Sequence, residues 1–224
     1  MMNNKALALL GALAATATAQ SENIRFGSAY SLGATNSYIV EAETTIYPGK
    51  THSPAQDRLA LWPGMGTDSG DLIQAIVLST DKQDGECGGT NDQWCVFASV
   101  LQGSQISGDS VPVDAGLGIT IKYAYDDSSK NYTQTVTVDG KVISSLESSS
   151  GKAIGWGTAV EAQNDLSGTV TAHSYEKTTI KLAEADLAFK DTLVLNEADA
   201  SDMITSDNGK TWTIEKINIH DSQF

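Results

Sequence analysis

The stretch from Leu72 to Leu78 is apolar on both faces of an extended chain except at Gln74. With the two-residue period of a β-strand, Gln74 shares one face with Leu72, Ile76 and Leu78. The segment therefore predicts a buried strand with one amide inside it. A buried amide without partners costs roughly 1–3 kcal/mol, so Gln74 either hydrogen-bonds within the sheet or faces a cleft where a ligand binds.

Strand patterns follow one another along the rest of the chain. They are separated by turns rich in Gly, Asn, Asp and Ser, of which Asp139-Gly140 is the strongest hairpin signal. The other predicted strands are 38–47, 94–101, 119–125, 132–138, 141–143, 178–182, 193–195 and 212–219. Only residues 182–190 have a helical pattern. Many strands without alternating helices predict an all-β fold, an antiparallel β-sandwich or jelly roll.

Residues 1–19 have the form of a secretory signal peptide. Lys5 gives a positive start, an apolar stretch covers 6–15, and Ala17-Thr18-Ala19 is a small-x-small cleavage site. We therefore expect a secreted, extracellular protein in which residues 20–224 form a single β-sandwich domain. No later segment approaches ~20 apolar residues, so a membrane span is not expected.

The formal net charge is −14, and Arg25 and Arg58 are the only arginines. Nucleic acids and anionic membranes bind through Lys and Arg, so this composition disfavours both as partners. The expected partner is an extracellular polypeptide, a glycan or a small molecule. The sequence contains no nucleotide-binding motif and no His or Cys spacing typical of a metal site, so neither a cofactor nor a metal is predicted.

Two short motifs gain a meaning from the predicted secretion. Cys87 and Cys95 are the only cysteines, and in a secreted chain such a pair indicates one disulfide that closes a small loop. Asn131-Tyr132-Thr133 is an N-glycosylation sequon, which predicts a sugar on Asn131 and a surface position for the loop before it.

The order of several segments resembles the secreted fungal glutamic peptidases, the eqolisins. In that family a strand ending in Pro is followed by a Trp-x-Gly segment, and a Leu-Gln strand supplies the catalytic glutamine. Here Tyr38 to Pro48 is followed by Leu61-Trp62-Pro63-Gly64 and then by Leu72-Ile73-Gln74-Ala75. A similar order continues through the Trp94 strand, 111–116 and 157–162. The chain also resembles uncharacterised secreted fungal proteins of the concanavalin A-like lectin/glucanase superfamily.

The eqolisin resemblance implies a sandwich whose concave face pairs a glutamine with a glutamate. The glutamate is the general acid/base for a water molecule, and the glutamine amide stabilises the oxyanion. Gln74 matches the glutamine. The family's catalytic glutamate has another acidic residue four positions later; matching Glu161 to that later residue puts Gly157 at the catalytic position. One hypothesis is a divergent acid endopeptidase in which Glu161, about 13 Å further along the same strand face, works with Gln74, and Trp62 is a groove wall.

Two other classes of function remain open. In the second hypothesis the sandwich binds or cleaves glycans, with Trp62, Trp94, Trp156 and Trp212 as candidate stacking platforms. Glu41 and Glu43 share one strand face, and a glycosidase needs two carboxylates about 5–9.5 Å apart. The third hypothesis is a small-molecule tailoring enzyme on the same scaffold. A lyase-like pair of His173 and Tyr175 is disfavoured for acidic glycans because arginine is scarce.

Overall fold

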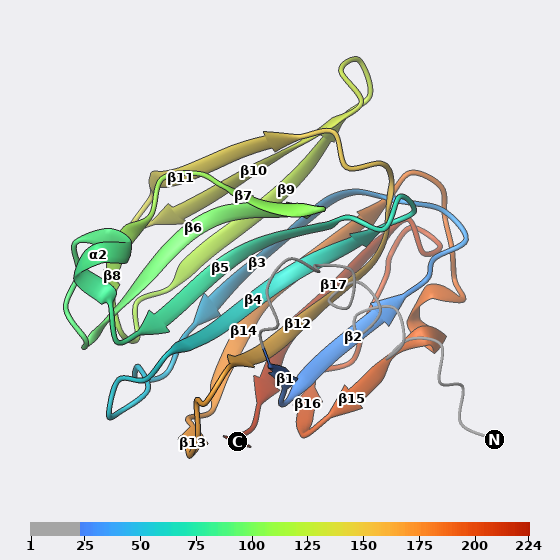
Figure 1. Ribbon diagram of the computed structural model, residues 1–224. Helices are drawn as coiled ribbons and strands as arrows, with labels where there is room; N and C mark the ends of the chain where they lie inside the picture. The colour runs from blue at the N-terminus through green and yellow to red at the C-terminus, as the bar shows by residue number, and fades with distance from the viewer. Residues whose placement is uncertain (1–22) are drawn as a thin grey trace.

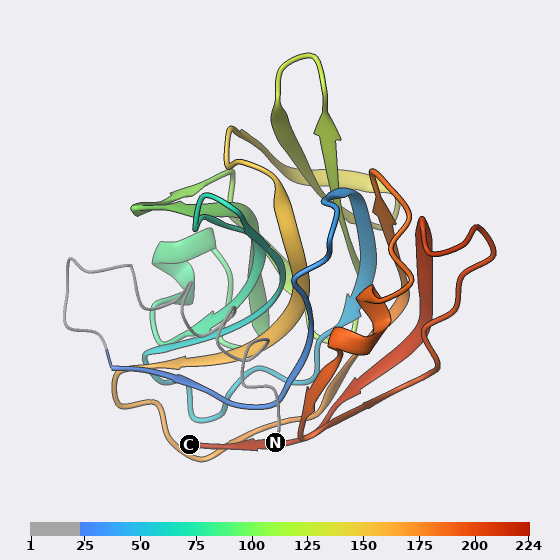
Figure 2. The ribbon, with the colours of Figure 1, turned by 90° about the vertical axis from the view of Figure 1, so that its right-hand side faces the viewer.

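The computed structural model describes residues 23–224 and has the predicted all-β, antiparallel β-sandwich architecture (Figure 1). The predicted signal peptide, residues 1–19, lies outside the described residues. The strands form two packed layers, which we call the groove layer and the back layer (Figure 2). Residue pairing between Ala153 and Ile39 joins the two layers along one side. Within residues 23–224, no helix has the length and apolar character needed to cross a membrane.

The groove layer has the strand order β15-β2-β12-β4-β5-β6-β7, with β1 beside β12 and β8 beside β6. Its strands are β1 (Ile24–Phe26), β2 (Ala29–Gly33), β4 (Arg58–Thr67), β5 (Leu72–Thr80), β6 (Gln93–Gln102), β7 (Ser104–Ser107), β8 (Val111–Asp114), β12 (Ala153–Gln163) and β15 (Val194–Asn196). The layer curves around the short helix α2 (Gln83–Cys87), so its outer face is concave (Figure 2).

The back layer has the strand order β11-β10-β9-β3-β14-β17-β16. Its strands are β3 (Ile39–Tyr47), β9 (Ile119–Asp126), β10 (Asn131–Val138), β11 (Lys141–Ser148), β14 (His173–Leu182), β16 (Ala198–Ala200) and β17 (Thr211–Ile219). A separate two-stranded sheet pairs β13 (Thr169–Val170) with β18 (Ser222–Gln223). The strands predicted from the sequence all occur, most of them one to a few residues longer or shifted at their ends.

Alternation along the strands sorts side chains between the two faces of the groove layer. In β5, Ile73, Ala75 and Val77 point into the main core between the layers, whereas Leu72 and Ile76 belong to a second apolar cluster on the concave face. The other main members of that second cluster are Ala60, Trp62, Leu78, Cys95, Phe97 and Ala159. The prediction that β5 is apolar on both faces is therefore confirmed. The unusual consequence is an apolar surface on the outer side of a sandwich layer.

Two details of the sequence prediction are wrong. The helical pattern of residues 182–190 gives turns and then a 3₁₀-helix, η1 (Phe189–Thr192), because the chain here connects the end of β14 to β15. In β3 the simple alternation fails at Val40: the pairing with β14 is shifted beside Glu41, and Ile39 is fully buried. A bulge of this kind cannot be recognised from the apolar pattern alone.

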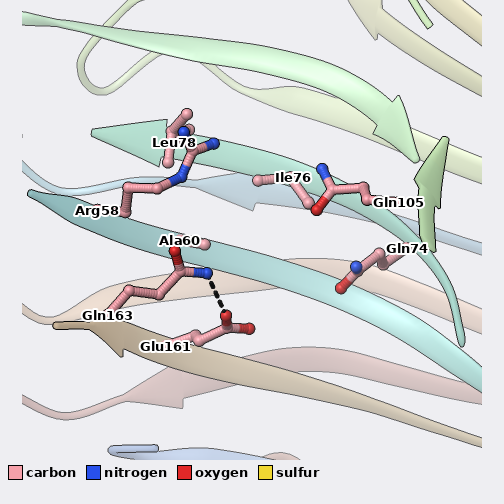
Figure 3. A pocket seen from close by; sticks show the side chains of 8 residues that line it. All are labelled: Arg58, Ala60, Gln74, Ile76, Leu78, Gln105, Glu161 and Gln163. Atoms are coloured by element: carbon pink, nitrogen blue, oxygen red, sulfur yellow. Dashed lines mark hydrogen bonds between the residues drawn. The ribbon is translucent and has the colours of Figure 1, made fainter. Parts of the chain in front are cut away.

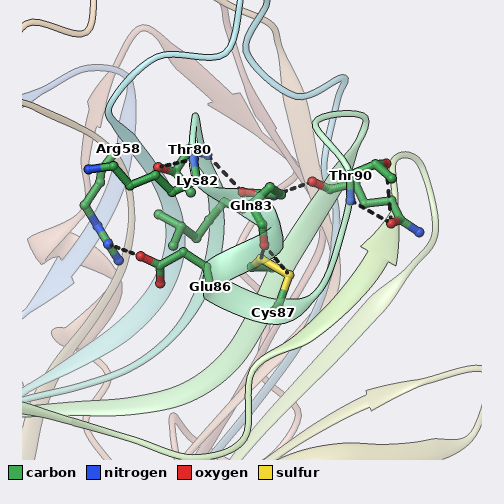
Figure 4. The surroundings of a disulfide bond; sticks show 10 residues. Arg58, Thr80, Lys82, Gln83, Glu86, Cys87 and Thr90 are labelled. Atoms are coloured by element: carbon green, nitrogen blue, oxygen red, sulfur yellow. Dashed lines mark hydrogen bonds and ion pairs between the residues drawn. A yellow bond between two sulfur atoms is a disulfide. The ribbon is translucent and has the colours of Figure 1, made fainter.

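The predicted disulfide between Cys87 and Cys95 is present and ties α2 to β6 (Figure 4). By loop-closure entropy a bridge over eight positions contributes about 2–3 kcal/mol. Gln83, the buried residue of α2, donates from its amide nitrogen to the carbonyl of Leu78, while its Oε1 accepts from the backbone nitrogen of Thr80. Helix α2 is therefore fixed at one end of the concave face.

Candidate functional site

The strand register brings Gln74 and Gly157 into one row across the concave face. Gln74 on β5 is paired with Gly64 on β4, and Gly64 is paired with Gly157 on β12. Directly paired residues of antiparallel strands share a face, so all three face the concave side. Two strand spacings, roughly 9–10 Å, separate the Cα atoms of Gln74 and Gly157. Gly157, the residue of β12 in the row of the predicted catalytic glutamine, therefore offers no side chain.

Gln74 is the polar centre of this row. Its side chain is 5% exposed, and among residues 23–224 its buried Oε1 atom has no hydrogen-bond partner. Of the two alternatives open from the sequence, the amide thus faces a cleft and is not bonded within the sheet. An unsatisfied buried acceptor of this kind costs about 1–3 kcal/mol, a cost that a ligand with an N–H donor would remove.

Glu161 on β12 faces the same side as Gln74, further along the layer. Its Oε2 accepts a hydrogen bond from Nε1 of Trp62 (2.9 Å), and its Oε1 accepts one from Nε2 of Gln163 (2.8 Å). The indole of Trp62 is 1% exposed and lies in the concave apolar cluster. Trp62 thus holds the carboxylate in a fixed orientation from within the sheet surface.

A pocket of about 180 Å³ contains both candidate catalytic residues (Figure 3). We call its apolar lining residues, Ala60, Ile76 and Leu78, the floor and its polar lining residues, Arg58, Gln74, Gln105, Glu161 and Gln163, the rim. Sites for whole small molecules usually measure about 300–1,000 Å³, so this volume suits one side chain of a larger ligand better.

Gln74 and Glu161 lie at separate places in this pocket. Gln74 is in register with Gly64, whereas Glu161 is in register with Ala60, four residues away on the same strand. Four residues correspond to about 13 Å along the strands, and two strand spacings add roughly 9–10 Å across them. The two side chains do not hydrogen-bond to each other. Each can contact a bound chain, but at positions of that chain several residues apart.

The remaining tryptophans lie in the core, where they cannot contact a ligand. Trp156 is 1% exposed and packs edge-on against Tyr30 with ring centroids 5.9 Å apart. It is five residues from Glu161, an odd number, so the alternation of β12 turns it to the inner face. The expectation that Trp156 contacts a substrate on the concave face is therefore not supported. Trp94 and Trp212 are also 1% exposed and belong to the same core.

Glu41 and Glu43 lie on β3 in the back layer, outside the pocket. Both carboxylates contact Nζ of Lys122 on β9, at 3.0 Å and 3.6 Å. The hydrogen bond from Lys122 to Glu41 raises the pKa of the lysine. These glutamates form an exposed ion-pair group on the outer sheet surface, not a pair of carboxylates in a groove.

The predicted glycosylation site begins β10, next to the exposed 127–130 turn. Nδ2 of Asn131 donates to Oε1 of Glu147 at 2.7 Å. Sugar attachment at Asn131 stays a prediction.

Three polar residues of the pocket were not identified from the sequence: Arg58, Gln105 and Gln163. Gln163 could have been found, because it is two residues after Glu161 and so shares its face. Arg58 and Gln105 could not, because their positions depend on which strands pair with β5 and β6. Among residues 23–224, no three His, Cys, Asp or Glu side chains group as metal ligands would.

No family model matches this sequence, and no curated protein resembles it significantly. Solved structures resemble its fold. Scytalido-glutamic peptidase with a peptide-based transition-state analogue has a TM-score of 0.51 and 12% identity, covering 87% of this chain and 99% of that one. SCP-B, a member of the eqolisin family in complex with the tripeptide Ala-Ile-His, has a TM-score of 0.50 and 11% identity, covering 89% and 99%. A galectin from Caenorhabditis elegans is more distant, with a TM-score of 0.36, 9% identity and coverage of 88% and 95%. At these identities the likeness shows the fold: this chain has the β-sandwich architecture of the eqolisin peptidases.

Proposed function

We propose that this protein is secreted and binds an extended polypeptide along the concave face of its groove layer. The observation that carries the proposal is Gln74, a nearly buried amide whose Oε1 lacks a partner among residues 23–224 and which lines a pocket on the outer side of the sandwich. A polypeptide supplies an N–H donor at every residue, and its side chains suit an apolar floor with a polar rim.

Three further observations support a polypeptide over the alternatives. Trp94, Trp156 and Trp212 lie in the main core, and Trp62 is not among the residues that line the pocket, so no tryptophan face is available there for stacking a sugar. The pocket is smaller than a typical site for a whole small molecule. The eqolisin structures that share the fold are described with a peptide-based inhibitor and a tripeptide.

The binding proposal predicts opposite effects of Gln74→Leu on affinity and on stability. Replacing a buried amide whose Oε1 has no partner by an apolar side chain of similar size is expected to stabilise the fold slightly, by up to about 1 kcal/mol, since no hydrogen bond to the part of the chain that the structure describes is lost. Affinity for a denatured polypeptide is expected to fall about tenfold, since a ligand donor loses its acceptor. The measurements are urea unfolding and fluorescence anisotropy with a labelled, reduced and alkylated polypeptide.

Gln134→Leu is the matched control. Gln134 is also buried, but its amide is paired with the backbone of Ser99 through Nε2 (2.8 Å) and Oε1 (3.4 Å). Its replacement is expected to destabilise the protein and to leave the affinity of the folded fraction unchanged. If Gln74→Leu and the unmodified chain bind the polypeptide equally well, the proposed binding face is wrong.

A second candidate function is peptide hydrolysis by Gln74 and Glu161, favoured because both line one pocket. It predicts that the purified protein cleaves a denatured polypeptide within about pH 2–7 and that Gln74→Ala and Glu161→Ala each abolish cleavage, because acid/base catalysis needs both groups. Gly157 lies in the row of Gln74, two strands away, and has no carboxylate to act as general acid/base. We therefore expect the unmodified protein to bind without cleavage. Cleavage lost in both variants would establish this second function instead.

A further inference from the structure

We propose that the pocket between Gln74 and Glu161 selects a basic side chain, arginine or lysine, of the bound polypeptide, and that Glu161 determines this specificity. The inference rests on the proposed polypeptide-binding function and names the class of ligand that the site prefers. It follows from the hydrogen-bond acceptors around the pocket and from its apolar floor.

The rim of the pocket presents the carboxylate of Glu161 and three amide oxygens as hydrogen-bond acceptors. Gln74 Oε1 has no partner among the described residues. Gln163 uses Nε2 to bond Glu161, and Gln105 uses Nε2 to bond Ser107 at 3.3 Å, which leaves the carbonyl oxygen of each amide available. The two bonds that Glu161 accepts occupy two of the roughly four lone-pair positions of a carboxylate. Arginine and lysine end in groups that only donate hydrogen bonds, so they match this rim.

The floor suits the stem of the same side chains. Ala60, Ile76 and Leu78 form an apolar strip that leads toward Glu161 (Figure 3). Lysine and arginine bury their methylene stems against apolar surfaces while the charged end reaches polar partners. A short side chain would leave the strip uncovered. An acidic side chain would be repelled by the carboxylate of Glu161.

Arg58 is the one cation on the rim, and its positive charge would repel a second cation. Its Nη1 is paired with Oε1 of Glu86 at 2.7 Å, and both side chains are 31% exposed (Figure 4). This ion pair offsets the charge of Arg58 locally. Glu161 therefore remains the carboxylate of the pocket that has no cationic partner among the described residues.

The test compares two octapeptides that differ at one central residue, arginine in one and its neutral isostere citrulline in the other. Unmodified protein is expected to bind the arginine peptide about 10- to 100-fold more tightly, the range for a hydrogen bond to a charged group. In Glu161→Gln, which keeps an acceptor for Trp62, this ratio is expected to fall to near 1.

Glu41→Gln controls for the general attraction of a protein with net charge −14 to any cationic peptide. It removes the same charge from the back layer, so the arginine/citrulline ratio is expected to persist. Equal binding of both peptides by the unmodified protein, or a ratio that survives Glu161→Gln, would overturn the specificity but not the polypeptide-binding function. Failure of both peptides and of the denatured polypeptide to bind would overturn the function itself.

Discussion

Gly157→Glu is expected to convert this protein into an acid-active peptide hydrolase. The substitution places a carboxylate in the row of Gln74, across Gly64, where the eqolisin resemblance puts the general acid/base. Gly64 lies between them without a side chain, and the six-membered ring of Trp62 is 3.2 Å from the point that its Cβ would occupy, so the carboxylate from β12 and the amide from β5 must approach each other past the edge of this ring. General acid–base catalysis contributes about 10²–10⁴-fold, and we expect a rate increase in this range for cleavage of a denatured polypeptide at about pH 3–5.

Gly155→Glu is the matched control for this substitution. Gly155 lies two residues before Gly157 on the same face of β12, but it is paired with Gly66 and not with the row of Gln74. It adds the same charge to the same surface and is expected to give no hydrolysis. The double variant Gly157→Glu, Gln74→Ala is expected to lose most of the gained rate, since an oxyanion donor is worth about 10²–10³-fold. A folded Gly157→Glu variant that binds polypeptide and does not cleave it would contradict this account.

The sequence predicts those parts of the fold that depend on neighbours along the chain. Alternation around Gln74 predicted both the strand and the exceptional position of its amide, because a two-residue period is a property of one strand alone. The spacing of Cys87 and Cys95 predicted the disulfide for the same reason, since eight positions are closed locally. The many strands without alternating helices predicted the sandwich architecture, and the family resemblance implied the same architecture.

The candidate site was less predictable because it depends on pairing between distant strands. The row of Gln74 and Gly157 exists only because β4 lies between β5 and β12, which is a matter of strand order and register. Glu41 and Glu43 have the alternation of groove residues, yet β3 belongs to the back layer, where Lys122 offsets their charge. The burial of Trp156 could have been predicted, because it is an odd number of residues from Glu161 on the same strand and so faces the core.

The stability of the protein is expected to fall by about 2–3 kcal/mol between about pH 7.5 and pH 4.5 because of one histidine. His173 begins β14, is 7% exposed, and stacks edge-on against Tyr175 at 5.6 Å between ring centroids. Burial lowers its pKa from 6.5 to about 4. The folded state therefore holds the ring neutral in a range where the unfolded chain already binds a proton. The stabilisation is complete above about pH 6.5 and is lost as the pH falls to about 4.

His173→Phe keeps an aromatic ring against Tyr175 and removes this titration. Its urea midpoint is expected to change less than that of the unmodified protein between about pH 7.5 and pH 4.5, while carboxylates titrate equally in both. His220→Phe is the control, because His220 is half exposed and pairs with Asp199 at the surface. Identical pH profiles for His173→Phe and the unmodified protein would contradict this account, because they would show that His173 binds its proton equally well in the folded and unfolded states. If the expected profile is found, the fold is least stable in the acidic range where the Gly157→Glu hydrolase should work, so each assay there must follow the folded fraction.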